Sequence, residues 1–167
     1  MFAICLIFSG IAFFLNGFLP LIDENDNNEI VIMNVLAGLI ISFLCLYGIF
    51  VAVDTTTYLT YASLLLFGIT HLFIAGICIW DLSEESLGWL SAILALIGLG
   101  LGIYYLLAGI TLLGIAWLVW MLIWLAYFLS RALGVLKTAS SWVIMLEGVI
   151  CLVLVGMLLL TGTLAIF

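Results

Sequence analysis

The sequence predicts an all-α integral membrane protein in which six transmembrane helices cross the bilayer. Hydrophobic residues make up 69% of the 167 positions and charged residues only 7%, and the mean hydropathy is +1.57. These values lie far outside those of water-soluble domains. A helix crosses the hydrocarbon core in about 20 apolar residues. Because the long apolar runs do not alternate with polar residues, the pattern favours helices over the strands of a membrane barrel.

Short polar segments divide the chain into spans of suitable length. The acidic segments DENDNNE (Asp23–Glu29) and DLSEES (Asp81–Ser86) follow the first and third spans, and DTTTYLT follows the second. The apolar stretch from Leu87 to Ser130 is too long for one crossing, so we divide it at an Ala-Gly turn near 107–111. Ser140 or Ser141 is expected to cap the last helix. The expected spans, which form one domain over 1–167, are 2–22, 30–53, 61–80, 87–107, 111–131 and 140–164.

The two basic residues, Arg131 and Lys137, lie in one loop between the fifth and sixth spans. The positive-inside rule makes that loop cytoplasmic. Counting spans then places both termini outside and the two acidic loops inside. The first apolar run is too long for a cleavable signal peptide and lacks a basic segment before it. We therefore expect a multi-pass protein of the cell (inner) membrane, with the lipid bilayer as its surroundings.

Several classes of function are excluded by what the sequence lacks. With two basic residues and a net charge of -7, nucleic-acid binding is not expected. There is no phosphate-binding loop for a nucleotide-driven pump, and no HExxH motif for an intramembrane hydrolase. The four cysteines are far apart, so neither a metal site nor a cofactor is expected. The protein is not expected to be an enzyme; a passive conduit, an ion-coupled carrier or a structural membrane protein remains.

Three tryptophans lie near the middle of the fifth span, in the segment WLVWMLIW. At 100° per residue, Trp117, Trp120 and Trp124 lie at about 0°, 300° and 340°, and Tyr127 lies at about 280°, so they share one helical face. Membrane tryptophans usually form belts near span ends. The other three tryptophans are placed in that way: Trp80, Trp89 and Trp142. A central position favours packing between helices or one wall of a passage.

Polar side chains within the spans are further candidates for function, because they are costly in lipid. Glu147 lies about seven residues into the sixth span. Its carboxyl group needs either a bonding partner on another helix or contact with water or a polar solute. Amides at Asn16 and Asn34 are able to hold Glu147, to link helices or to contact a solute. One face of the first span mixes small, apolar and polar side chains at helical spacing: Leu6, Ser9, Phe13 and Asn16.

His71 is the single histidine of the chain and lies mid-span in FGITHLF, four residues after Phe67 and on the same face. A lone histidine in a membrane helix either forms hydrogen bonds that help the helices to pack or makes a proton-sensitive contact in a pathway. The residues alone leave both interpretations open.

Five short motifs lie on five of the six spans. They are NG at Asn16–Gly17, MNxxxG at Met33–Gly38, FGxTxL at Phe67–Leu72, WxxWxxxW at Trp117–Trp124 and LEG at Leu146–Gly148. Each motif is weak by itself, but their order and spacing resemble the bacterial urea/amide channel family, the AmiS/UreI type, over essentially the whole chain.

This resemblance implies a six-helix protomer with its own pore, assembled as a homo-hexamer whose centre is filled by lipid. It also implies passive conduction of urea or short-chain amides, and both termini outside, in agreement with the position of the basic loop. The pore residues that the resemblance implies are Leu6, Ser9, Phe13, Asn16, Phe67, His71, Trp117, Trp120, Ile123, Trp124 and Glu147.

Two features depart from the acid-gated relatives in this family. His71 stands where a tyrosine is familiar in those relatives, and the outer segments, DTTTYLT and the turn at Ala108–Gly109, are short and contain no histidine. We therefore expect a passive urea channel without loop-based acid gating. The alternatives are a short-chain aliphatic amide channel that uses the same route, a proton-coupled carrier in which Glu147 binds the proton, and a structural membrane protein.

Overall fold

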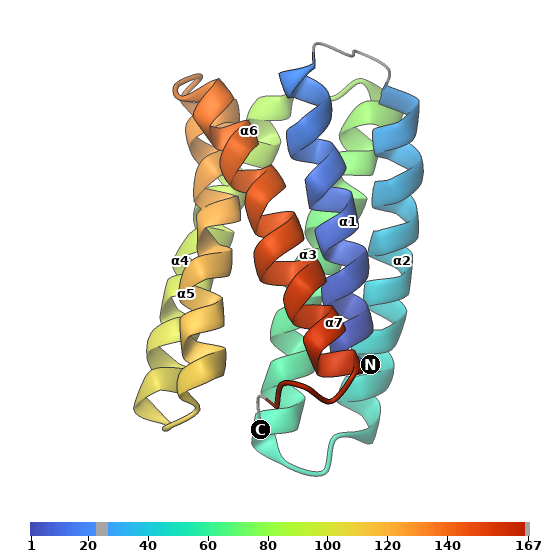
Figure 1. Cartoon of the computed structure of the whole chain (residues 1–167). Coiled ribbons are helices and arrows are strands. Elements are labelled where there is room, and N and C mark those ends of the chain that lie inside the picture. The colour runs from blue at the N-terminus through green and yellow to red at the C-terminus, as the bar shows by residue number, and fades with distance from the viewer. Residues whose placement is uncertain (23–26, 166–167) are drawn as a thin grey trace.

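The computed structural model describes residues 1–22 and 27–165. These form a bundle of long helices whose axes are roughly aligned (Figure 1). The elements are α1 (Phe2–Phe18), η1 (Leu19–Leu21), α2 (Asn27–Val51), α3 (Thr55–Trp80), α4 (Glu84–Leu107), α5 (Thr111–Tyr127), η2 (Phe128–Ala132), α6 (Lys137–Leu146), η3 (Glu147–Leu154) and α7 (Val155–Leu160). In the described part of the chain, six helical segments are long and apolar enough to cross a membrane. The prediction of an all-α protein with six such helices is confirmed.

The ten elements of the described chain make six candidate membrane spans, because some of the short elements continue a neighbouring helix along the same axis. The helix η1 extends α1, η2 extends α5, and α6, η3 and α7 follow one another as one rod (Figure 1). Both η2 and η3 are π-helices, whose turns are wider than those of an α-helix. Such turns are rare and are frequently found at functional sites, and η3 begins at Glu147.

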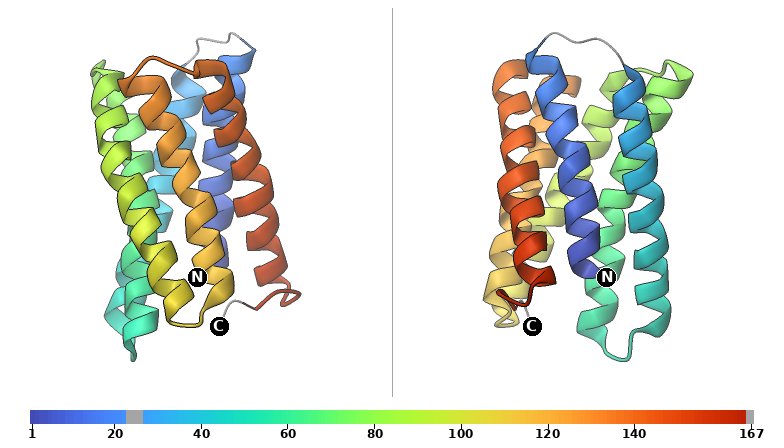
Figure 2. Two further views of the ribbon diagram at one scale, coloured as in Figure 1. Left: turned by 90° about the vertical axis from the view of Figure 1, so that its left-hand side faces the viewer. Right: turned by 45° about the vertical axis from the view of Figure 1, so that its right-hand side comes forward.

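The helices pair as neighbours along the chain. The helices α2 and α3 form one antiparallel pair, α4 and α5 form another, and α1 packs against both α2 and the rod that begins with α6 (Figures 1 and 2). The α3–α4 and α5–α6 connections lie at one end of the bundle, whereas Met1 and the end of α7 lie at the other. The segment 81–86 and the loop with both basic residues therefore share one end, as the predicted topology requires.

Several helices begin earlier than the sequence predicts: α2 and α4 by three residues each, and α3 and α6 as follows. Helix α3 begins at Thr55 rather than near residue 61, because the Asp54 carboxylate accepts hydrogen bonds from the Thr57 backbone N–H (2.8 Å) and hydroxyl (2.7 Å). Helix α6 begins at Lys137, so neither of the two serines that follow is its cap. Leu136 precedes it with a left-handed backbone (φ 52°) and no side-chain cap. The expected turn between α4 and α5 is present, with Gly109 in the left-handed region (φ 79°).

Helix α1 and the rod approach so closely that no side chain separates them at two glycines. A Cβ atom built on Gly148 would lie 2.7 Å from the carbonyl oxygen of Gly10, and one on Gly10 would collide with the backbone of Gly148. Small residues permit such close backbone contact in membrane bundles. This contact fixes the depth of Glu147, which directly precedes Gly148, against the middle of α1.

Candidate functional site

Aromatic rings from two helices meet at the centre of the bundle. The ring of Phe67 on α3 contacts three indole rings of α5, with centroid distances of 5.9 Å to Trp117, 5.7 Å to Trp120 and 4.8 Å to Trp124. Trp117 and Trp124 are stacked, with an interplanar angle of 15°. All four side chains are buried. We call Phe67, Trp117, Trp120 and Trp124 the aromatic cluster.

Hydrogen bonds to neighbouring helices hold two of these indole rings in place. The Trp124 Nε1–H donates to the hydroxyl oxygen of Thr70 on α3 (2.9 Å), and that hydroxyl donates to the Leu66 carbonyl oxygen (2.8 Å). The Trp120 Nε1–H donates to the carbonyl oxygen of Cys151 in η3 (3.2 Å). These two rings therefore present apolar carbon surface to the centre of the bundle, because their only polar hydrogens are already bonded.

Polar side chains form a second group, on the first three helices. Ser9 Oγ lies 2.8 Å from Nε2 of His71, and Nδ1 of His71 lies 2.8 Å from Oδ1 of Asn34. Asn34 and Asn16 exchange two hydrogen bonds between their amides, of 2.7 and 3.1 Å. All four side chains are buried. We call Ser9, Asn16, Asn34 and His71 the polar network.

The pattern of donors in the polar network determines the form of its histidine. Asn34 donates from Nδ2 to the Ile30 carbonyl oxygen (2.8 Å) and to Asn16 Oδ1, so its Oδ1 accepts from the other side. His71 Nδ1 must therefore carry the hydrogen, and in the neutral ring Nε2 accepts from the Ser9 hydroxyl. Both ring nitrogens are occupied. The same bonds use all four hydrogen-bonding positions of the Asn34 amide.

Phe13 joins the two groups. Its ring centroid lies 4.4 Å from that of His71 in the polar network and 6.1 Å from that of Phe67 in the aromatic cluster. Since Ser9, Phe13 and Asn16 follow helical spacing on α1, one face of this helix contacts both groups.

Glu147 is buried, yet neither carboxylate oxygen has a hydrogen-bond partner among the described residues. It lies at the start of η3, four residues before Cys151, whose carbonyl oxygen accepts from Trp120. A buried carboxyl group without partners is costly in a membrane. These oxygens are therefore free to accept hydrogen bonds from a small polar molecule that reaches them.

The residues singled out by the sequence lie on four segments. Leu6, Ser9, Phe13 and Asn16 lie on α1, Phe67 and His71 on α3, Trp117, Trp120, Ile123 and Trp124 on α5, and Glu147 on η3. All of them are buried. Ring contacts and hydrogen bonds join most of them, while Leu6 and Ile123 belong to the same apolar core.

Sequence reasoning missed two groups that hold the indole rings, the Thr70 hydroxyl and the Cys151 carbonyl oxygen. A threonine within an apolar helix was a signal for the first. A backbone carbonyl carries no signal in the sequence. Across residues 1–22 and 27–165, no three His, Cys, Asp or Glu side chains are grouped in a way that would hold a metal ion.

The six long apolar helices and the buried mixture of rings and polar groups define a small multi-pass membrane protein. Residues 1–163 match the family described as the AmiS/UreI family transporters, and the chain belongs to this family. The family and the structural neighbours are transporters and channels, not enzymes.

One relative and two solved structures illustrate the likeness. A protein of Mycolicibacterium smegmatis named for the transport of amidate substrates is 32% identical over 112 residues, which are 65% of this chain and 53% of that protein's length. The crystal structure of the urea channel from the human gastric pathogen Helicobacter pylori matches with a TM-score of 0.86 at 22% identity, covering 99% of this chain and 100% of that one. The closed state of that channel, from electron cryomicroscopy, matches with a TM-score of 0.85, the same identity and the same coverage.

Proposed function

We propose that the protein is a passive channel for urea, which passes between α1, α3, α5 and η3 along the aromatic cluster, Phe13 and Glu147. The observation that carries this proposal is the buried pair of unpartnered Glu147 oxygens, on the segment that also accepts the hydrogen bond of Trp120. Urea is flat, neutral and polar, so flat apolar walls suit its faces and a few polar groups suit its edges. Indole rings supply such walls.

The hydrogen bonds of the indole N–H groups indicate which side chain forms hydrogen bonds with the edges of the solute. The N–H groups of Trp120 and Trp124 are bonded within the protein, whereas Glu147 is free to accept from the NH₂ groups of the solute. Because the rings contact one another, a ring must move aside as a solute passes. Ions are rejected, because hydrocarbon walls do not replace a hydration shell.

The close alternative is a channel for short-chain aliphatic amides, favoured by the Mycolicibacterium relative named for amidate substrates. An amide shares the flat shape and the NH₂ group of urea, so the same route suits both. The third possibility is a proton-coupled carrier in which Glu147 binds the proton, and it differs by concentrating its substrate instead of equilibrating it.

We further infer a homo-hexamer with central lipid in a bacterial inner membrane, with both termini outside and without acid gating by loops. Large apolar side chains on α2 and α4 are exposed, among them Phe43 and Leu96. They must be covered by lipid or by neighbouring protomers. Arg131 and Lys137 at the end away from Met1 support the orientation.

The decisive experiment measures the swelling of proteoliposomes by stopped-flow light scattering with urea, acetamide and glycerol, at neutral and acid pH. We expect fast urea and acetamide entry and slow glycerol entry. Trp120→Ala and Trp124→Ala should change urea flux several-fold and admit glycerol, because each widens the slot. Trp142→Ala, at a half-exposed position on α6, is the matched control. Unchanged flux and selectivity in both slot variants would contradict the proposed route.

A second measurement separates the channel from the carrier. A proton ionophore should leave urea entry unchanged, and the internal urea concentration should only reach the external one. Accumulation above the external concentration that is lost in Glu147→Gln would establish the carrier instead.

A further inference from the structure

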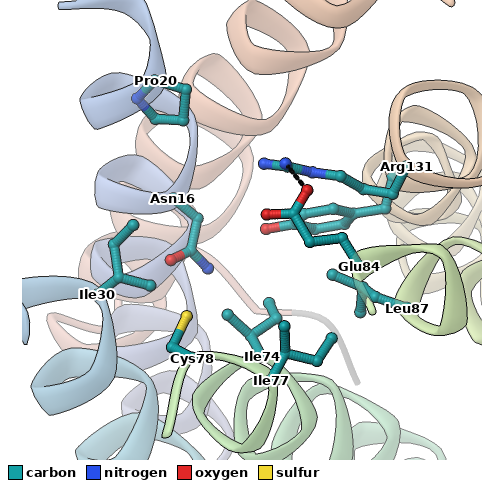
Figure 3. A pocket seen from close by; sticks show the side chains of 10 residues that line it. Asn16, Pro20, Ile30, Ile74, Ile77, Cys78, Glu84, Leu87 and Arg131 are labelled. Carbon is teal, nitrogen blue, oxygen red and sulfur yellow. Dashed lines mark hydrogen bonds and ion pairs between the residues drawn. The ribbon is translucent and has the colours of Figure 1, made fainter. Parts of the chain in front are cut away.

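A polar cavity lies at the end of the bundle away from Met1, beyond the polar network. Two chambers of about 180 and 300 Å³ adjoin there, and four residues line both: Asn16, Pro20, Glu84 and Arg131. Figure 3 shows Asn16 on one side of the inner chamber, facing the ion pair of Glu84 and Arg131 on the other. The ion pair thus stands at the boundary between the two chambers.

The inner, smaller chamber also contains a polar group that lacks a hydrogen bond of normal geometry. The hydroxyl of Tyr127 on α5 is buried, and among the described residues the Asn16 side chain interacts with it, outside normal hydrogen-bond geometry. A tyrosine hydroxyl both donates and accepts. Asn16 lines the same chamber, and its amide retains one hydrogen and one lone pair beyond its two bonds to Asn34. Buried polar groups without partners mark a place where another molecule is expected to bind.

The charges of the chamber favour a neutral ligand. Glu84 supplies acceptors and Arg131 supplies donors, and a solute with an amide group has NH₂ donors next to a carbonyl acceptor. Such a solute matches both partners without changing the balance of charge, whereas an ion would leave one partner unpaired. The pair is partly exposed, with 30% of the Arg131 and 60% of the Glu84 side chain accessible. Exposed ion pairs contribute little to stability, so a solute readily takes over part of their hydrogen bonding.

The size of the chamber fits one small solute. The volume of about 180 Å³ is several times the roughly 30 Å³ that one water molecule takes up in the liquid. Urea and acetamide each have four heavy atoms, so either fits. The remaining lining is apolar and comes from α2, α3 and α4: Ile30, Ile74, Ile77 and Leu87, with the Cys78 thiol beside them.

We propose that the inner chamber binds one neutral amide-bearing solute between Asn16 on one side and the Glu84–Arg131 ion pair on the other, with the Tyr127 hydroxyl as a further contact. This site lies apart from Glu147 and the aromatic cluster, at the end of the route that the proposed function describes, and it rests on that function for its choice of solute. A solute that leaves the slot is held there before it passes the ion pair.

Cys78 provides a direct probe of this chamber, because its thiol is part of the lining. In a protein with Cys5, Cys45 and Cys151 replaced by alanine, the reaction of Cys78 with methyl methanethiosulfonate is followed in liposomes. Acetamide and urea should slow the reaction several-fold and saturably, and glycerol should not. The control retains Cys151 alone, since Cys151 lines an apolar cavity between α5 and the rod, and its reaction should be unaffected by any of the three solutes.

Tyr127→Phe tests the named contact, because it removes only the hydroxyl. In the Cys78 protein it should raise the acetamide concentration for half-protection several-fold. Ser91→Ala is the matched control, since Ser91 also has a buried hydroxyl without a partner in the described chain but does not line this chamber. Protection that is absent, equal with glycerol, or unchanged in Tyr127→Phe would overturn the proposal, and so would a Cys78 that fails to react without solute. These outcomes are independent of the swelling assay, whose failure counts against the proposed function instead.

Discussion

The polar network and the aromatic cluster lie side by side in the core but differ in how completely their polar atoms are bonded. In the network, Asn34 uses every hydrogen-bonding position and His71 uses both ring nitrogens. On the aromatic side, two indole N–H groups are bonded, but Glu147 keeps both carboxyl oxygens free. Asn34 and His71 have nothing left to offer a solute, and within the network only Asn16, at its edge, keeps a free donor and acceptor. The network therefore mainly holds α1, α2 and α3 together, while the aromatic side lines the route proposed for the solute.

The largest effect on stability is expected for Asn34→Leu, at the centre of the network. The change leaves polar atoms of His71 and Asn16 without partners, which costs about 1–3 kcal/mol. At about 2–4 °C per kcal/mol for a chain of this size, thermal unfolding in detergent should begin roughly 2–12 °C lower. Leu36→Ala, at an exposed position on the same helix, serves as the control. An Asn34→Leu protein that unfolds at the wild-type temperature would contradict the conclusion that the network holds the three helices together.

Thr70→Val tests whether a hydrogen bond to the aromatic cluster affects flux more than stability, because Thr70 lies on α3 and its hydroxyl accepts from the Trp124 indole N–H. Valine keeps the shape of the side chain and leaves the Trp124 N–H without an acceptor, at a cost of about 1 kcal/mol. We expect a several-fold change in urea swelling rate with only a small fall in unfolding temperature. Thr70→Ser retains the hydroxyl and should behave as the wild type. Loss of stability without any change of flux would show that Thr70 only stabilises the fold.

Ser9→Ala removes one bond of the network, the one to His71 Nε2. The expected loss is smaller, about 0.5–1.5 kcal/mol. As His71 is the single histidine, ¹⁵N-histidine labelling gives a direct measurement by NMR. In the wild type, Nδ1 should be protonated and Nε2 should be an acceptor, and Ser9→Ala should shift the Nε2 signal while leaving Nδ1 protonated. A wild-type ring with its proton on Nε2 would contradict the described direction of the bonds.

The smallest effect is expected at Asp54, which lies outside both regions. Hydrogen bonds from the Thr57 backbone N–H and hydroxyl lower the pKa of this carboxyl group below its ordinary value. A lowered pKa in the folded protein stabilises it at pH values above the ordinary pKa, and this contribution is lost as the pH falls through the lowered value. Asp54→Ala should therefore unfold slightly below the wild type at neutral pH, and the gap should close in acid below about pH 4. A gap that persists in acid would show that the charge is not its cause.

Sequence patterns predicted the number of helices and the burial of the tryptophan face, because hydropathy and helical spacing are local properties. Trp117, Trp120 and Trp124 are at most 1% exposed, while Trp80, Trp89 and Trp142 near the span ends are 70%, 52% and 49% exposed. The start of α3 was missed because Asp54 caps a run of threonines that looked like a loop. The bonds from Trp124 to Thr70 and from Trp120 to Cys151 depend on how neighbouring helices align along their axes, which no local pattern specifies.

The contact between Gly10 and Gly148 bears on how the chain is synthesised. Of the six helices, α1 leaves the ribosome first and the rod that begins with α6 leaves last, yet these two pack backbone against backbone. The glycine face of α1 must therefore wait in the membrane until the other spans have been inserted. A nascent chain that stops before α6 therefore leaves the face of α1 around Gly10 without its backbone partner.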